Sequence, residues 1–170
     1  IRNRPVVVKV DSRDGSVVWA ARFADGDARG HGSSPSLSPD ESTLYIGRVG
    51  HDVARVYAMA TADGAHRWSW FPSEYRDHTF TWPLPVVAPE GTVYMQDEYF
   101  ARVYVIDSDG AHRWTFARDG SEAPRTAALA DGVFYTSYGA DPPTIVAIGP
   151  DGEALWERRL DEGDMAGGLV

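Results

Sequence analysis

Short runs of β-branched and aromatic residues recur along the chain, and each is followed by a polar turn and a tryptophan. The runs cover residues 6–10, 55–59, 102–106 and 144–148, and Asp-Gly follows each of them within a few positions. Asp-Gly is a strong hairpin signal, because glycine adopts positive φ at no steric cost and aspartate can hydrogen-bond its own backbone. Each run and the tryptophan segment after it are therefore predicted to form an antiparallel pair of strands.

The same phrase occurs four times at one internal spacing. The tryptophan stands four positions after the glycine in every copy, at Trp19, Trp68, Trp114 and Trp156. The copies are separated by about 46 residues, which is a repeat period rather than a chance match. A second shared hairpin precedes the last three copies, with strands expected at 34–37, 84–88 and 126–130 and turns at Pro39-Asp40, Pro89-Glu90-Gly91 and Asp131-Gly132.

Four short antiparallel strands in each repeat predict a β-propeller blade. In a propeller each blade is covered on both faces by its neighbours, which explains why the strand before Asp-Gly is almost continuously apolar rather than alternating. No segment shows the apolar spacing of an amphipathic helix. The predicted fold is all-β, a propeller of four-stranded antiparallel blades.

The phrase Val-Lys-Val-Asp-Ser-Arg-Asp-Gly-Ser-Val-Val-Trp, from Val8 to Trp19, resembles the repeat of the pyrroloquinoline-quinone-like (PQQ-like, quinoprotein-type) β-propellers, and the likeness extends over the whole chain. The resemblance implies that the four repeat tryptophans dock between adjacent blades in a structural role. A large ring with one N–H donor suits such a recurring contact. The resemblance implies a bacterial protein and favours a periplasmic or extracellular location, which the residues themselves leave undetermined.

The resemblance also implies a ring that usually closes at seven or eight blades, so residues 1–170 are expected to form a partial propeller, about half of the ring. Both ends of the chain look cut. The expected blades and blade fragments are at about 1–22, 33–71, 81–117 and 125–159, followed by the first strand of the next blade at 165–170.

Charge and composition limit the classes of partner and of site that the chain can have. The chain has 25 acidic and 16 basic residues and a formal net charge of −9, which disfavours nucleic acid and anionic membrane surfaces. No apolar run approaches the ~20 residues that span a bilayer, so no membrane insertion is expected. The absence of cysteine excludes disulfides, thiolate zinc sites and cysteine nucleophiles.

No catalytic residue and no metal site is predicted. A quinone dehydrogenase of the family would imply a disulfide of adjacent cysteines and a calcium ion held by glutamate and asparagine, but the only asparagine is Asn3. Asp107–Gly110 and Asp25–Asp27 resemble fragments of calcium loops, yet neither continues to the glutamate that an EF-hand loop requires. The histidines form no cluster with metal-ligand spacing, and His66 and His112 occupy one repeat position.

Departures from the repeat are where repeat proteins usually carry binding residues. The longest departure, from Phe71 to Trp82, is dense in aromatic and charged residues. The resemblance implies that loops of this kind share one face around the central channel. The residues expected to converge on this loop face are Arg29, His31, Glu74, Tyr75, Arg76, Asp77, His78, Trp82, Glu98, Tyr99, Arg118, Glu122 and Arg125. The alternative is that these loops are solvated connections, with Trp70 and Trp82 as additional core.

Two hypotheses of function follow. The first is a non-enzymatic, cofactor-free binding or scaffold module that presents the loop face to a protein, peptide or glycan. The alternative is a segment of a quinone-dependent (PQQ and calcium) dehydrogenase or a sugar-active enzyme, with its catalytic residues in other blades. Either way, the remaining blades or a second copy of the chain are expected as partners within one ring.

Overall fold

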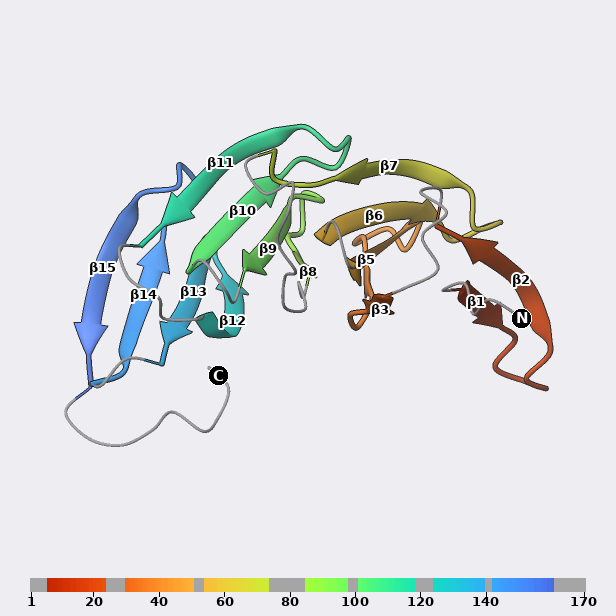
Figure 1. Ribbon diagram of the computed structural model, residues 1–170, viewed down its shortest axis with the longest axis horizontal. Helices are drawn as coiled ribbons and strands as arrows, with labels where there is room; N and C mark the ends of the chain where they lie inside the picture. Colours follow the sequence, from red (N-terminus) through yellow and green to blue (C-terminus); the bar gives the residue numbers. More distant parts are fainter. Residues whose placement is uncertain are drawn as a thin grey trace. The chain divides into compact units, whose positions relative to one another are not determined.

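The computed structural model describes residues 6–23, 30–50, 54–73, 85–97, 101–118, 124–139 and 142–160. Within these ranges every regular element is a β-strand (Figure 1), and no helix there is long and apolar enough to cross a bilayer. The chain divides into two compact units, residues 1–85 and 86–170.

The strands form antiparallel sheets that follow the chain order. In the first unit β1 (Val6–Val10) pairs with β2 (Val17–Arg22), and the next sheet contains β3 (Gly30–Gly32), β4 (Ser36–Leu37), β5 (Thr43–Gly50), β6 (Ala54–Ala60) and β7 (His66–Trp70). The third sheet contains β8 (Pro85–Val87), β9 (Val93–Asp97), β10 (Arg102–Ile106) and β11 (His112–Ala117). The fourth contains β12 (Pro124–Ala130), β13 (Val133–Tyr138), β14 (Thr144–Ile148) and β15 (Ala154–Arg159).

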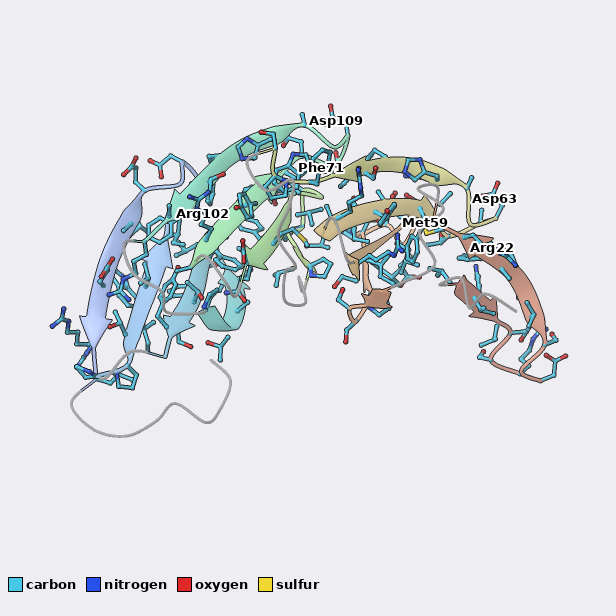
Figure 2. All side chains as sticks on the ribbon, viewed as in Figure 1. Arg22, Met59, Asp63, Phe71, Arg102 and Asp109 are labelled. Atoms are coloured by element: carbon cyan, nitrogen blue, oxygen red, sulfur yellow. The ribbon has the colours of Figure 1, made fainter. Side chains whose placement is uncertain are left out.

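The predicted fold class is confirmed, and the four runs singled out in the sequence are β1, β6, β10 and β14. Each pairs with the tryptophan strand after it, in a register that places Lys9 opposite Trp19, Ala58 opposite Trp68, Val105 opposite Trp114 and Ala147 opposite Trp156. The turns lie where Asp-Gly predicts them, and Figure 2 shows Asp63 and Asp109 at the turns before β7 and β11.

The first strand of the second sheet differs from its prediction. Residues 34–37 were expected to form one strand, but β3 begins earlier, at Gly30, and a break at Ser33–Pro35 separates it from β4; both pieces pair with β5. At the break the Ser33 hydroxyl, not a backbone carbonyl, accepts the Gly47 amide at 2.9 Å. Pro35 has no amide hydrogen to donate, so the regular ladder stops there.

Strands inside a sheet are buried on both faces, as the apolar runs predict. Val103 and Val105 of β10 lie in the core of the second unit, and the alternate residues Tyr104 and Ile106 are also buried. This core joins the third and fourth sheets, because it also contains Phe134, Val146 and Ile148. Burial on both faces is typical of a strand between two covering layers.

Aromatic pairs connect neighbouring sheets within each unit. The rings of Tyr94 (β9) and Phe134 (β13) stack with centroids 4.9 Å apart and planes 5° apart. In the first unit, Phe23, just after β2, contacts Tyr57 of β6 with centroids 4.5 Å apart. Aromatic pairs at these separations, whether stacked or tilted, add to the stabilisation from burial.

Two of the repeat tryptophans reach the Asp-Gly turn of the following sheet. The Trp19 Nε1 donates to the Thr61 carbonyl, and the Trp114 Nε1 donates to the Pro150 carbonyl, both at 3.0 Å. The Trp114 ring also contacts that of Tyr94 in its own sheet, with centroids 6.0 Å apart. That these contacts hold the blades together energetically remains a prediction.

Gly64 and Gly152 lie in turns on which an indole packs, and both the backbone conformation and the packing require glycine there. Gly64 has φ +75° and Gly152 has φ +89°, in the left-handed region that side chains disfavour. A Cβ on Gly64 would stand 2.8 Å from Cε3 of Trp19, and one on Gly152 would stand 2.8 Å from Cδ2 of Trp114. Gly15 has a similar φ of +73°, but nothing lies within 4 Å of its Cβ position.

Gly64→Ala is expected to lower the free energy of unfolding by about 2–4 kcal/mol, the sum of backbone strain and a displaced indole. Gly15→Ala is the matched control with the same strain and no neighbour, and its loss is expected to stay near 1 kcal/mol. Urea unfolding monitored by tryptophan fluorescence measures both. Equal losses for the two variants would show that the indole contact contributes nothing.

Trp114→Ala is expected to cost about 3–5 kcal/mol of stability, because it removes a packed indole and its hydrogen bond. Trp156 stands at the same repeat position but is 45% exposed, so Trp156→Ala is expected to cost less than about 1 kcal/mol. The midpoints of thermal unfolding compare the two. A Trp114 variant that melts with the wild type would exclude the structural role.

Candidate functional site

One of the residues predicted for the loop face has a described side chain, Arg118. His31 lies on β3 and Arg125 on β12, although their side chains are not among those described. The remaining members lie outside the described residues: Arg29, Glu74, Tyr75, Arg76, Asp77, His78, Trp82, Glu98, Tyr99 and Glu122. Convergence of the whole set on one face therefore stays a prediction.

A buried polar residue occupies the same repeat position near the loop end of β5, β9 and β13. Arg48, Asp97 and Tyr138 each stand three positions after the tyrosine that contacts the repeat tryptophan of its sheet. They are 2%, 5% and 0% exposed. Charged residues are rarely buried to this degree without partners, so this repeat position carries polar chemistry inside an otherwise apolar strand.

In the second unit this position adjoins Arg118, which follows β11. The Arg118 guanidinium lies over the ring of Tyr138 at 5.0 Å, and its Nη2 approaches Glu157 Oε2 at 3.4 Å. The backbone amide of Arg118 donates to the Ala101 carbonyl at 3.4 Å, which fixes the start of the side chain. Arg118 thus connects the third sheet to the fourth through an aromatic face and a carboxylate.

In the first unit the equivalent junction has the opposite arrangement. The Arg48 guanidinium, from the second sheet, lies 5.3 Å from the ring centre of Phe23, which follows β2. A second arginine at the same end, Arg55, lies 4.3 Å from the ring centre of Phe71; Figure 2 shows Phe71 just after β7. Cations over aromatic faces at these distances attract the ring quadrupole.

The Tyr138 hydroxyl has no hydrogen-bond partner among the described residues. Burial raises the pKa of Tyr138 far above its usual value, the positive charge of Arg118 lowers it in part, and the charge of Glu157 raises it. The hydroxyl therefore stays protonated at physiological pH. A buried, unpaired hydroxyl destabilises the fold.

The calcium-loop fragments noted in the sequence can be compared with the described residues. Across the described ranges, no group of three or more His, Cys, Asp or Glu side chains could hold a metal ion. Asp107, which suggested a calcium-loop fragment, begins the turn before β11, and its carboxylate pairs with Arg113 Nε at 2.6 Å. The Asp109 carboxylate accepts the Ala111 amide within that turn. Asp25–Asp27 lies outside the described residues.

Four of these residues were not predicted from the sequence: Arg48, Asp97, Tyr138 and Glu157. The signal that could have found the first three is register: aligning the strands on Tyr45, Tyr94 and Tyr135 places them in one column of mostly polar residues. No spacing pairs Glu157 with Arg118, because the two come from different repeats that only packing brings together.

A family model described as "Outer membrane protein assembly factor BamB" matches residues 3–162. No curated protein matches the sequence significantly.

Several solved structures share the fold. BamB from Moraxella catarrhalis matches with a TM-score of 0.61 and 21% identity over 85% of this chain and 40% of that one. A protein of unknown function from Bacteroides caccae matches with 0.60 and 15%, over 88% of this chain and 52% of its own. The Dos1 propeller matches with 0.69 and 15%, over 94% of this chain and 40% of its own. The chain thus spans about half or less of these proteins.

Tyr138→Phe is expected to leave stability unchanged or to raise the free energy of unfolding by about 1 kcal/mol, because it removes a buried hydroxyl without a partner. Tyr135→Phe, on the same strand but only partly buried, is the control and is expected to change stability by less than about 0.5 kcal/mol. Urea unfolding at pH 7 compares them. A clear loss of stability in Tyr138→Phe would show that the hydroxyl is hydrogen-bonded.

Proposed function

This chain belongs to the outer membrane protein assembly factor BamB family of PQQ-like propellers, and we propose that it is a non-catalytic module that binds a protein through the loop ends of its blades. The observation that carries the proposal is the set of stacked arginines at those ends. Arg55 lies over Phe71 and Arg118 over Tyr138, at 4.3 and 5.0 Å.

Arginine and aromatic side chains are the residues most enriched at the centres of protein interfaces. A guanidinium already held against a ring loses less conformational freedom on binding than a mobile one, so it supports affinity at lower entropic cost. Arg118 keeps 18% of its side chain exposed and Glu157 keeps 44%, so a partner could reach both.

The family supports a protein as the partner class. The Moraxella catarrhalis relative is an outer-membrane assembly factor by name, and assembly factors act on other proteins. The net charge of −9 further disfavours nucleic acid. A protein, a peptide and a glycan would give crosslinked adducts of different mass and composition, so mass spectrometry of the adduct distinguishes these partner classes.

The proposal predicts that crosslinks form from the loop end and not from the turn end. A photo-crosslinking amino acid replaces Ala117, an exposed residue beside Arg118 at the loop end of β11, or Asp109 at the turn end of the same sheet, in cells that express the protein. The Ala117 variant is expected to yield a defined protein adduct, and Arg118→Glu is expected to reduce its amount by about tenfold or more. Mass spectrometry identifies the adduct.

Arg113→Glu, at the turn end, is the matched control and is expected to leave the adduct unchanged. Equal adducts from Ala117 and Asp109, or none from Ala117, would contradict the proposed surface. In a separate arm, the purified chain and any longer protein that contains it are incubated with pyrroloquinoline quinone, Ca²⁺ and a redox dye. Dye reduction with an alcohol or sugar would overturn the non-catalytic assignment in favour of a dehydrogenase.

A further inference from the structure

The described residues contain Asp-Gly in turns of two kinds. Asp14, Asp63, Asp109 and Asp151 begin it in the turns that precede the tryptophan strands, and Asp131 begins it in the hairpin between β12 and β13 (Figure 1). Glycine has no side chain to shield its backbone amide from the aspartate before it. The two kinds of turn differ in what this amide and this carboxylate bind.

Aspartate followed by glycine can rearrange without an enzyme. The glycine amide nitrogen attacks Cγ of the protonated aspartate carboxyl group, and the amide hydrogen and the carboxyl hydroxyl leave together as water, which produces a cyclic succinimide. Water then opens the ring at one of its two carbonyls. Opening at one carbonyl restores aspartate, and opening at the other directs the main chain through the side chain as isoaspartate. An amide or carboxylate that is hydrogen-bonded elsewhere must first leave its partner.

In the turns before the tryptophan strands, the glycine amide is hydrogen-bonded within the turn. The donor and acceptor pairs are Gly15 to Asp11, Gly64 to Ala60, Gly110 to Asp107 and Gly152 to Gly149, at 2.8, 2.9, 2.9 and 3.1 Å. The carboxylates accept the backbone amide two residues further on: Asp14 from Ser16, Asp63 from Ala65, Asp109 from Ala111 and Asp151 from Glu153, at 2.9, 2.9, 3.1 and 3.3 Å. Both reacting groups are therefore held by other partners.

The hairpin between β12 and β13 has neither of these hydrogen bonds. Ala130 pairs with Val133, so the turn consists of Asp131 and Gly132 alone. The Gly132 amide donates to no residue that the structure describes, and the Asp131 carboxylate accepts from none of them. Among the described atoms, nothing lies within 4 Å of the Cβ position of Gly132. The two reacting groups are thus adjacent and not bound elsewhere.

The backbone of this turn is also in an unfavourable conformation. Asp131 has φ +51° and Gly132 has φ +77°, the pair of positive values that a two-residue type I′ turn requires. The left-handed region is unfavourable for a residue with a side chain. Isoaspartate adds a methylene group to the main chain, so the two-residue turn cannot persist after the rearrangement. The change would lie close to Phe134 of β13, which is fully buried and stacks on Tyr94.

The equivalent hairpins of the second and third sheets are protected from this reaction. They carry Asp40-Glu41 and Glu90-Gly91. The Glu41 amide donates to the Ser38 carbonyl and the Gly91 amide to the Ala88 carbonyl, both at 2.8 Å. A glutamate side chain would in addition have to close a larger ring. The reactive arrangement therefore belongs to the fourth sheet alone among the described hairpins of this kind.

We propose that Asp131-Gly132 is a site of spontaneous isoaspartate formation, and that the hydrogen bonds of the other described Asp-Gly turns protect them from it. The protecting bonds lie inside each turn, so they form whichever other blades are present. The modification is independent of the loop-end surface proposed above, because that surface contains neither residue.

The test follows isoaspartate in the folded chain, alone or within any longer protein that contains it, over weeks at physiological pH. Peptide mapping after incubation in isotopically labelled water locates the label that ring opening inserts. A protease that cleaves before aspartate but not before isoaspartate identifies the product. Asp131 is expected to form isoaspartate about tenfold faster than Asp63 or Asp109, the factor that follows if one protecting hydrogen bond must break first. The mapping separates the peptides of Asp25 and Asp119, which also precede glycine but lie outside the described residues.

Two controls separate the effect of the fold from that of the sequence. In concentrated urea the protecting hydrogen bonds are absent, so Asp131, Asp63 and Asp109 are expected to react at similar rates. Asp131→Glu keeps the charge but would have to close a larger ring, so it is expected to remove the product at this position and leave the other sites unchanged; circular dichroism verifies that the variant is folded. Equal rates at the three aspartates of the folded chain, a slower rate at Asp131, or the same preference for Asp131 in urea would each overturn the proposal.

Discussion

Each four-stranded sheet of this chain is apolar on both faces, so it must be covered on both sides. β9 is buried along its whole length, and β10 and β14 have apolar residues on both faces. A blade alone cannot bury these faces, and its stability comes largely from the blades beside it. Two contacts between the third and fourth sheets contribute to this covering: the Tyr94 ring stacks on Phe134, and the Trp114 indole donates a hydrogen bond to the Pro150 carbonyl.

The same requirement decides where function can be located. The faces of the blades are used for packing, so binding residues must lie at the strand ends and in the loops. Arg118 illustrates the consequence: its backbone belongs to one sheet, while its side chain contacts Tyr138 and Glu157 of the next. A surface built in this way exists only when neighbouring blades are packed, and its integrity is tied to the stability of the junction.

The strands were predictable because their signals are local. A β-branched run, an Asp-Gly turn and a tryptophan at fixed spacing locate β1, β6, β10 and β14 to within a residue or so. The break between β3 and β4 was missed: Pro35 is a local signal for an interrupted ladder, but the sequence does not show that the Ser33 hydroxyl reaches Gly47 on another strand. The pairing of Arg118 with Glu157 was not predicted for a similar reason, because it joins two repeats whose relative register is set by packing.

The two described junctions use the same attraction with the residues exchanged. In the first unit Phe23 follows the strand that contains Trp19, and the next sheet supplies Arg48; in the second unit Arg118 follows the strand that contains Trp114, and the next sheet supplies Tyr138. A cation over an aromatic face attracts the ring whichever of the two sheets supplies the cation. The repeat therefore preserves the contact between neighbouring sheets while the side chains that make it change places, and this is why matching the two repeats residue by residue does not reveal the contact.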